Sequence, residues 1–246
     1  MTPSRHPHTV KNELDALLAS LIERGIADDQ NFPALRQLST DGWEVSFDGA
    51  EHVSLAMGDS DYSEIYRELS EKRSYNVKLI DGGLLQIMYL FKDDRLVRHR
   101  LAYYPSPNLS PFQMEPDAYL RDELFLDIVS RRIVPFPLRF DFDEAGAEDV
   151  IHPGCHLTLG DVKDCRIPVS APLTPRWFIE FVLRNFYQTR EHDFVAGLPA
   201  HRFSFADTLT RDESRVIHVV VPQAMSKLSS ISRVLGAGLP AAGQRP

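Results

Sequence analysis

The chain has 246 residues, 43% of them hydrophobic and 25% charged, which is the balance of a globular protein with a substantial core. Its formal net charge of -8 argues against a generally basic nucleic-acid-binding protein and against a polybasic protein of membrane surfaces. We find no apolar run near the roughly 20 residues that a membrane-spanning helix needs, and no apolar core of a secretory signal near Met1. Two cysteines, Cys155 and Cys165, are too few for a disulfide framework. We therefore expect a reduced, cytoplasmic protein that does not contact membranes.

The first half of the sequence predicts two helices and two β-hairpins. Apolar residues recur at helix spacing over residues 9–27, where Gly25 ends the pattern, and again over residues 61–73. Alternating apolar and polar residues, together with the turn signal Asp48-Gly49, predict paired strands. The expected strands are residues 43–47 and 52–57, followed by residues 84–91 and 96–104 with a turn at 92–95.

The second half begins with a proline-rich loop at residues 105–116, which is a candidate soft boundary. Thr174-Pro175 is a strong helix start, with Thr as the N-cap and Pro in the first turn. A further helix is expected at residues 117–130, and strands are expected at 137–142, 155–160, 165–169 and 215–221. Hairpins separated by helices predict one α+β domain over residues 1–235, with a mainly antiparallel sheet and flanking helices. Residues 236–246 are expected to form a flexible tail.

The tetrad His-apolar-Ser/Thr-apolar occurs twice, at His52-Val53-Ser54-Leu55 and at His156-Leu157-Thr158-Leu159. On a strand, the imidazole and the hydroxyl two residues later point to the same face. Two such strands side by side would suit phosphodiester chemistry, because one imidazole can deprotonate a 2′-hydroxyl or a water while the other protonates the leaving oxygen. Ser54 and Thr158 would hold the phosphate oxygens. The pattern resembles that of two-histidine phosphoesterases; the alternative is that His52 and His156 are strand histidines with ordinary partners.

A metal site is a second interpretation of the same region. Asp141 and Asp143 share one face of a strand, and with His152 and His156 they form a ligand mixture that suits Mn²⁺, Fe²⁺ or Zn²⁺. Pro153-Gly154 excludes a helix between the histidines, and in an extended chain their Cα atoms would lie about 13 Å apart, too far for one ion. A turn at Pro153-Gly154 would bring them together. The sequence therefore predicts no cofactor, with a divalent metal at Asp141 and Asp143 as the alternative.

Arg139, Arg166 and Arg184 have apolar neighbours in the sequence, so each needs a carboxylate partner or an anionic ligand. Binding of phosphate is the functional interpretation. Salt bridges within the protein are the competing one, with Asp141, Asp143 or Asp164 as the partners.

The alternation of side chains along a strand argues against two further candidate sites. Arg98 and Arg100 near Tyr103-Tyr104 suggest a patch for single-stranded nucleic acid, but a strand would turn His99 to the other face and leave an ordinary solvated hairpin. Cys155 and His156 are adjacent and would also point to opposite faces, so we do not expect a cysteine hydrolase.

Five blocks of the sequence resemble a bacterial family catalogued only as a domain of unknown function. They are residues 100–107, 137–143, 152–160, 165–169 and 181–187, all within residues 80–190. The resemblance implies a soluble bacterial protein, and it brings no assigned activity, cofactor or catalytic residue.

The leading functional hypothesis is a protein that acts on nucleic acid or nucleotide phosphates, with hydrolysis at a histidine acid/base site. The catalytic candidates are His156, His52 and His152, and the phosphate-binding candidates are Thr158, Ser54, Arg139 and Arg166. The alternative is a non-catalytic partner subunit of a mobile-element, toxin–antitoxin or antiviral defence system, which would bind a partner protein. The sequence leaves open whether the protein is an enzyme.

Overall fold

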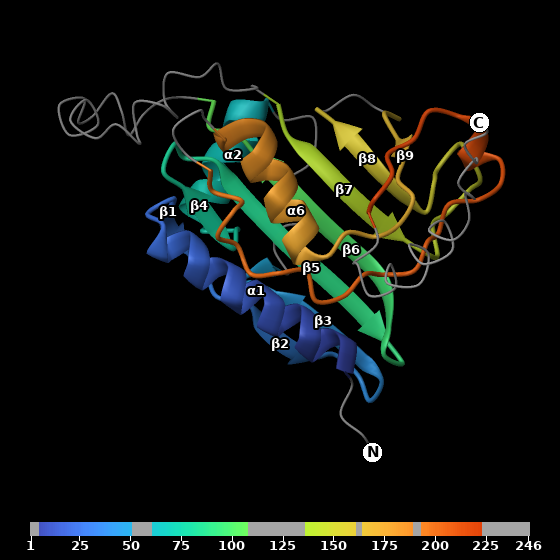
Figure 1. The fold of residues 1–246 in the computed structure, drawn as a ribbon, viewed down its shortest axis with the longest axis horizontal. Helices are drawn as coiled ribbons and strands as arrows, with labels where there is room; N and C mark the ends of the chain where they lie inside the picture. Colours follow the sequence, from blue (N-terminus) through green and yellow to red (C-terminus); the bar gives the residue numbers. More distant parts are fainter. Residues whose placement is uncertain (1–4, 51–60, 108–135, 161–163, 189–192, 223–246) are drawn as a thin grey trace, which may run out of the picture.

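In the described residues, nine strands form one open sheet (Figure 1). They are β1 (Ala27–Gln30), β2 (Ala34–Gln37), β3 (Gly42–Ser46), β4 (Val77–Leu79), β5 (Leu84–Lys92), β6 (Arg95–Tyr104), β7 (Leu138–Asp143), β8 (Cys155–Leu159) and β9 (Ile167–Pro168). The order is β1-β4-β5-β6-β7-β8-β9, and β3 and β2 extend the sheet beside the second half of β5. All of these strand pairs are antiparallel. The predicted α+β fold with a mainly antiparallel sheet is confirmed.

The structure is a computed structural model that describes residues 5–50, 61–107, 136–160, 164–188 and 193–222. β6 from the first half of the chain is hydrogen-bonded to β7 from the second half, so both halves contribute to the same sheet. The predicted strand at 52–57, the helix at 117–130, the tail at 236–246 and most of the loop at 105–116 lie outside the described residues.

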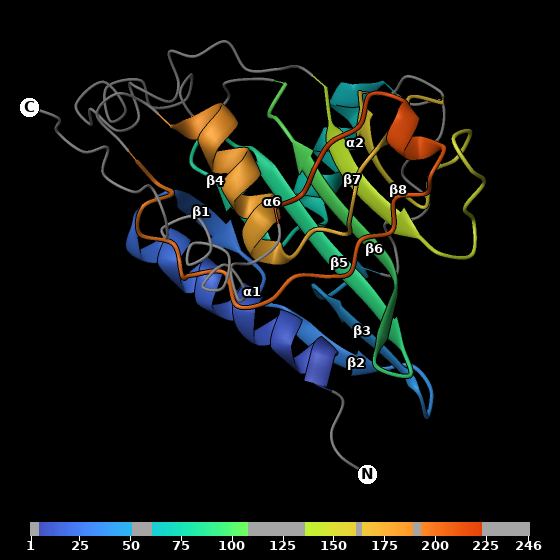
Figure 2. The same ribbon diagram turned by 45° about the vertical axis from the view of Figure 1, so that its right-hand side comes forward.

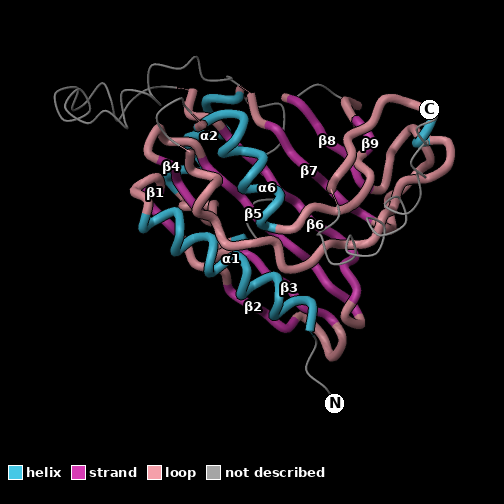
Figure 3. Tube along the Cα trace, in the orientation of Figure 1, coloured by secondary structure: helices cyan, strands magenta, loops and turns pink. Residues whose placement is uncertain are grey.

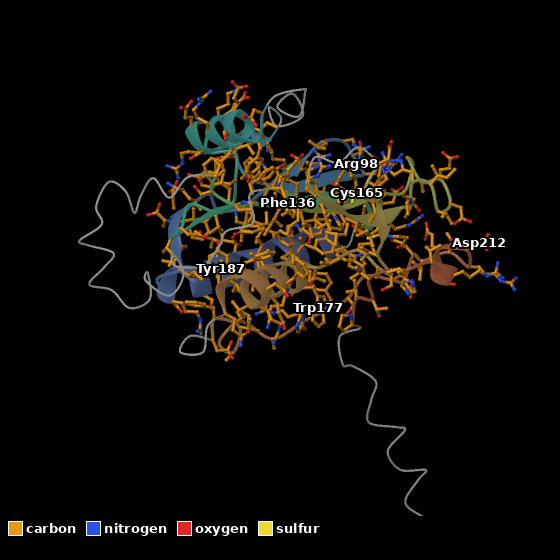
Figure 4. The ribbon with its side chains drawn as sticks, turned by 90° about the horizontal axis from the view of Figure 1, so that it is seen from above. Arg98, Phe136, Cys165, Trp177, Tyr187 and Asp212 are labelled. Atoms are coloured by element: carbon orange, nitrogen blue, oxygen red, sulfur yellow. The ribbon has the colours of Figure 1, made fainter. Side chains whose placement is uncertain are left out.

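The helices lie on both sides of the sheet. α1 (Arg5–Glu23) and α6 (Pro175–Val182) pack on one face, and α2 (Tyr62–Glu71) packs on the other (Figures 1 and 4). α6 continues as a π-helix, η2 (Leu183–Tyr187), and a short 3₁₀ helix, η3 (Glu213–Arg215), follows. Within the described ranges, none of the helices combines the length and the apolar character needed to cross a membrane.

Local sequence explains several element boundaries. Gly25 adopts a φ of 67°, the left-handed conformation that often follows a helix, although α1 covers Arg5–Glu23 rather than the predicted 9–27. Thr174 caps α6 as predicted, because its Oγ1 accepts a hydrogen bond from the backbone N–H of Trp177. Asp93 and Asp94 both have positive φ values, which suits the two-residue turn between β5 and β6.

The main core lies between the sheet and the helices α1 and α6. Every second residue of β6 and β7 points into it, including Leu101 and Tyr103 on β6 and Leu138, Phe140 and Phe142 on β7. On the opposite face, α2 covers an apolar cluster at one end of the sheet, and Met88 of β5 packs in a smaller cluster with Phe47 and Ala50. This alternation leaves the other residues of β6, β7 and β8 on a face that α1 and α6 do not reach.

The predicted strand at residues 215–221 is wrong. Residues 193–222 run as a loop between α1 and α6 and then beside β9 (Figures 2 and 3). A single parallel bridge joins Val219 to Val169, and Ile217 is 92% exposed. Pro168 accepts a hydrogen bond from the N–H of Val219, but it has no N–H of its own to donate. The pairing between β9 and this segment therefore does not extend beyond one bridge.

Candidate functional site

Alternate residues of β6, β7 and β8 form a polar surface on the side of the sheet opposite α1 and α6. This polar face consists of Arg98, Arg100, Arg139, Asp141, Asp143, His156 and Thr158, with His152 and Arg166 at its border. In Figure 4, Arg98 lies on the α2 side of the sheet, whereas Trp177 and Tyr187 lie on the α6 side. His99 is buried in the core, so the predicted alternation between Arg98, His99 and Arg100 is confirmed.

Strand pairing arranges the polar face in two rows. In one row, His156 is opposite Asp141, and Asp141 is opposite Arg100. In the next row, Thr158 is opposite Arg139. Side chains that are directly opposite on neighbouring strands have Cβ atoms about 5 Å apart. Four of the sequence-selected residues are therefore mutual neighbours.

Arg166 extends these rows at the edge of the sheet. Pro168 on β9 is opposite His156, Arg166 immediately precedes β9, and the charge of Arg166 acts on His156. Its Nη1 lies 3.0 Å from Oδ1 of the exposed Asp164, and ion pairs with exposed partners stabilise weakly. Thr158 is therefore opposite Arg139 on β7, and Arg166 lies one residue beyond the last paired residue of β9.

The rings of His152 and His156 lie 5.2 Å apart between their centroids. Two backbone hydrogen bonds between His152 and Glu148, of 2.7 and 2.8 Å, close the loop before β8. The chain turns at Pro153-Gly154 instead of running extended. This turn brings the side chains of His152 and His156 closer together than an extended chain would allow. The structure therefore brings together two of the three catalytic candidates.

The environment of His156 fixes its tautomer. The side chain is only 5% exposed, and Nδ1 lies 2.8 Å from the backbone oxygen of Pro153. Because a carbonyl oxygen only accepts hydrogen bonds, Nδ1 carries the proton of the neutral ring and Nε2 keeps its lone pair. Nε2 makes no hydrogen bond to the described residues.

Burial is the main reason that the pKa of His156 lies below its ordinary value. The Pro153 hydrogen bond and the charge of Asp141 act in the opposite direction, and the charges of His152 and Arg166 add to the lowering. The ring is therefore neutral at pH 7 and can accept a proton at Nε2.

The carboxylates of the polar face pair with arginines. Asp141 lies 3.1 Å from Nε of Arg100 and 3.7 Å from Nε of Arg139, and Asp143 lies 2.9 Å from Nη2 of Arg98. The salt bridges predicted from Arg139 to Asp141 and from Arg166 to Asp164 are present. Arg184 pairs instead with Glu180 on the α6 side of the sheet.

Within the described residues, no three His, Cys, Asp or Glu side chains form a group that could hold a metal ion. Asp141 and Asp143, the two candidate ligands from the sequence, are engaged with arginines. We therefore derive no metal chemistry at the polar face.

A family model described as an uncharacterized conserved protein (DUF2290) matches residues 26–221. The chain belongs to this family. The predicted membership of a domain-of-unknown-function family is confirmed, and the described polar face lies wholly within the DUF2290 region. No curated protein and no solved structure matches the chain, so the comparisons do not support the resemblance to two-histidine phosphoesterases.

The remaining candidates of this DUF2290 protein lie elsewhere. His52 and Ser54 are outside the described residues, so the first tetrad has no described position. Cys155 points into the core, opposite Phe142, and burial raises the pKa of its thiol well above the ordinary value. A protonated, buried thiol is a poor nucleophile, in agreement with the strand argument.

Sequence reasoning missed a second buried polar cluster, on the α6 side of the DUF2290 fold. Both carboxylate oxygens of Asp81 accept hydrogen bonds from the hydroxyl of Tyr187, at 2.8 and 2.9 Å, and Oδ1 also accepts from the N–H of Gly83. The hydroxyl of Tyr103 lies 3.0 Å from that of Tyr187. The available signal was Asp81-Gly82-Gly83 between two apolar runs, but nothing local could indicate a partner 106 residues away.

Proposed function

We propose that this protein acts on nucleic acid or nucleotide phosphates at the polar face, by phosphodiester hydrolysis in the bacterial cytoplasm. One observation carries the proposal: His152 and His156 have ring centroids 5.2 Å apart, beside a hydroxyl and two arginines. Paired imidazoles can supply a base and an acid to one reaction. The paired base and acid make hydrolysis a better fit than binding alone.

His156 is the base in this proposal. Its Nε2 takes the proton of a 2′-hydroxyl or of a water as that oxygen attacks phosphorus. The bond from phosphorus to the leaving oxygen then breaks, and a protonated imidazole returns a proton to that oxygen. His152, whose ring centroid lies 5.2 Å from that of His156, is the acid in this proposal, and His52 is the other candidate for this role.

Thr158, Arg139 and Arg166 hold the phosphate in this proposal. The hydroxyl of Thr158 can donate one hydrogen bond, and the two guanidinium groups on neighbouring strands can each donate two to a phosphate. Thr158 Oγ1 makes no hydrogen bond to the described residues, so its donor is not already used within them. Ser54 is expected to assist from the first tetrad.

The experiment is hydrolysis of a 2′,3′-cyclic nucleotide and of a short RNA by the full chain and by His156→Asn. Asparagine can still donate a hydrogen bond to the Pro153 oxygen, but it has no group equivalent to Nε2 that could accept a proton. We expect kcat to fall about 100-fold or more, with a melting temperature close to that of the wild type.

His218→Asn is the matched control, because His218 also places Nδ1 near a backbone oxygen, that of Val216, but lies away from the polar face. This variant should keep full activity. Equal activity of His156→Asn and His218→Asn, or no hydrolysis by the wild type, would overturn the proposal.

The second candidate is a partner subunit of a mobile-element, toxin–antitoxin or antiviral defence system. The observation that favours it is the exposure of Ile217 and Val220, which lie three residues apart in one loop and are 92% and 68% exposed. Exposed apolar side chains in one region often mark a protein interface. Ile217→Asp should then abolish binding to the product of a neighbouring gene without lowering the melting temperature; unchanged binding would exclude this interface.

A further inference from the structure

Asp141 on β7 is directly opposite His156 on β8, and both side chains lie on the polar face. Side chains in this arrangement have Cβ atoms about 5 Å apart. The side chain of Asp141 is 16% exposed and His156 is buried. Water screens the charges of buried groups weakly, so the charge of Asp141 acts on the His156 ring more strongly than it would at an exposed position.

The proposed reaction places a positive charge on this ring. His156 starts neutral, with its proton on Nδ1, and becomes an imidazolium when Nε2 takes the proton of the attacking oxygen. Burial opposes that charge and lowers the pKa of His156, whereas the hydrogen bond to Pro153 and the charge of Asp141 raise it. The reaction is therefore helped by a negative charge beside the ring when the proton arrives.

The elements packed around His156 contribute charges of different sign. His152 in the loop before β8 and Arg166 next to β9 both lower the pKa of His156, because their positive charges repel the imidazolium. His99 of β6 points into the core on the other side of the sheet. Among the described residues, Asp141 is the negative group that acts on the ring.

Arg100 holds the carboxylate of Asp141 in place. Its Nε lies 3.1 Å from Oδ1 of Asp141, and the two residues are opposite each other on β6 and β7. Nε of Arg139 approaches the other carboxylate oxygen at 3.7 Å. Arg100, Asp141 and His156 thus form one row across three strands. The positive charge of Arg100 offsets part of the negative charge that reaches His156.

We propose that Asp141 is the counter-ion of the imidazolium formed on His156, and that Arg100 limits how strongly this counter-ion acts. The two positioning residues thereby set the pH at which His156 serves as the base. No proton passes to Asp141: the proton stays on Nε2, and the carboxylate stabilises the charge that the transfer creates. The inference rests on the proposed function for its role in hydrolysis, whereas the coupling of the two charges is measurable without a substrate.

The test is an NMR titration of the His156 ring in the full chain, with the ring resonance assigned from its loss in His156→Asn. In Asp141→Asn the midpoint should move to lower pH, because the attraction is lost and the arginines remain. In Arg100→Gln it should move to higher pH, because the carboxylate is less offset. A loosened fold would instead move both variants toward the ordinary 6.5, since exposure removes the cost of burial.

Asp143→Asn is the matched control. Asp143 lies on the same strand and the same face, but it pairs with Arg98 at 2.9 Å, and its backbone N–H donates to Gly154. It is a diagonal neighbour of His156, farther away than a directly opposite residue, so the midpoint should stay close to that of the wild type. An Asp141→Asn midpoint that is unchanged, raised, or matched by Asp143→Asn would overturn the inference.

Hydrolysis of a 2′,3′-cyclic nucleotide by the same variants connects the counter-ion to the reaction. At pH 8, kcat of Asp141→Asn should fall about tenfold, because the imidazolium that forms during the reaction is less stable. A lowered midpoint with an unchanged kcat would overturn the role in hydrolysis. If the wild type hydrolyses nothing, the proposed function fails, and the titration still upholds or refutes the coupling between Asp141 and His156.

Discussion

Glu13 shows how burial alone can move a carboxyl group into the physiological range. It lies on α1 and is almost fully buried, and its Oε2 accepts a hydrogen bond of 3.3 Å from the backbone N–H of Arg176 in the first turn of α6. Burial raises its pKa to about 7, although the backbone N–H groups and the charges of Arg176 and Arg202 act in the opposite direction. This single side chain therefore links α1 to α6 and makes that link sensitive to pH.

Glu13 should make the protein less stable as the pH rises. Its pKa is about 7 in the folded chain against an ordinary 4.5, so folding takes up a proton between these values. The stabilising contribution is complete below pH 4.5 and is lost as the pH rises through 7. Between pH 5 and pH 8, the wild type should lose about 2–3 kcal/mol more free energy of unfolding than Glu13→Gln. Urea unfolding at both values measures this, and equal losses in the two proteins would refute it.

At the scale of elements, the turn between β4 and β5 is fastened to the π-helix η2. Tyr187, the last residue of η2, donates to both carboxylate oxygens of Asp81 in this turn. A Cβ atom at Gly83 would lie 2.6 Å from the hydroxyl of Tyr187 and 2.9 Å from Cε2 of Tyr103. Only glycine therefore permits the close approach of the turn to the two tyrosines.

Gly83→Ala should destabilise the protein by about 1–3 kcal/mol, because the new methyl group would overlap two buried side chains. Gly146→Ala is the control: its Cβ would lie no closer than 3.6 Å to any atom, so the expected change is within about 0.5 kcal/mol. Chemical denaturation measures the free energy of unfolding of the two variants. Similar losses in Gly83→Ala and Gly146→Ala would show that the turn at Gly83 can accommodate a methyl group, which contradicts the prediction.

Elements defined by local signals were predictable from the sequence. The cap at Thr174 and the turn at Asp93-Asp94 depend on residues within a few positions of one another, and both were found. The alternation from Leu138 to Asp143 correctly indicated which side chains leave the core. The short strands β1, β2 and β4 carry too few residues for a pattern and were missed.

Features that depend on distant partners could not be predicted. The segment 215–221 has the alternation of a strand, but a strand also needs a neighbour, and Val219 finds only one bridge. The 5.2 Å approach of His152 to His156 depends on the turn geometry at Pro153-Gly154. The sequence indicated which residues could form the site, whereas the pairing of the strands determines which of these residues are neighbours.

For the molecule as a whole, the two faces of the sheet have different tasks. The face toward α1 and α6 holds the main apolar core, and the opposite face collects arginines in a chain whose net charge is -8. Arg98, Arg100 and Arg166 of this face pair with carboxylates, so the polar face is built as a network of ion pairs. We propose that the neutral imidazole of the buried His156 acts on this face as a base.

The most direct test is the pH dependence of kcat/KM for cleavage of a 2′,3′-cyclic nucleotide by the full chain. Because burial lowers the pKa of His156, the rate should rise with pH through a value below the ordinary 6.5 of histidine. In His156→Asn this rise should disappear together with most of the activity. A rise that persists unchanged in His156→Asn would contradict the account.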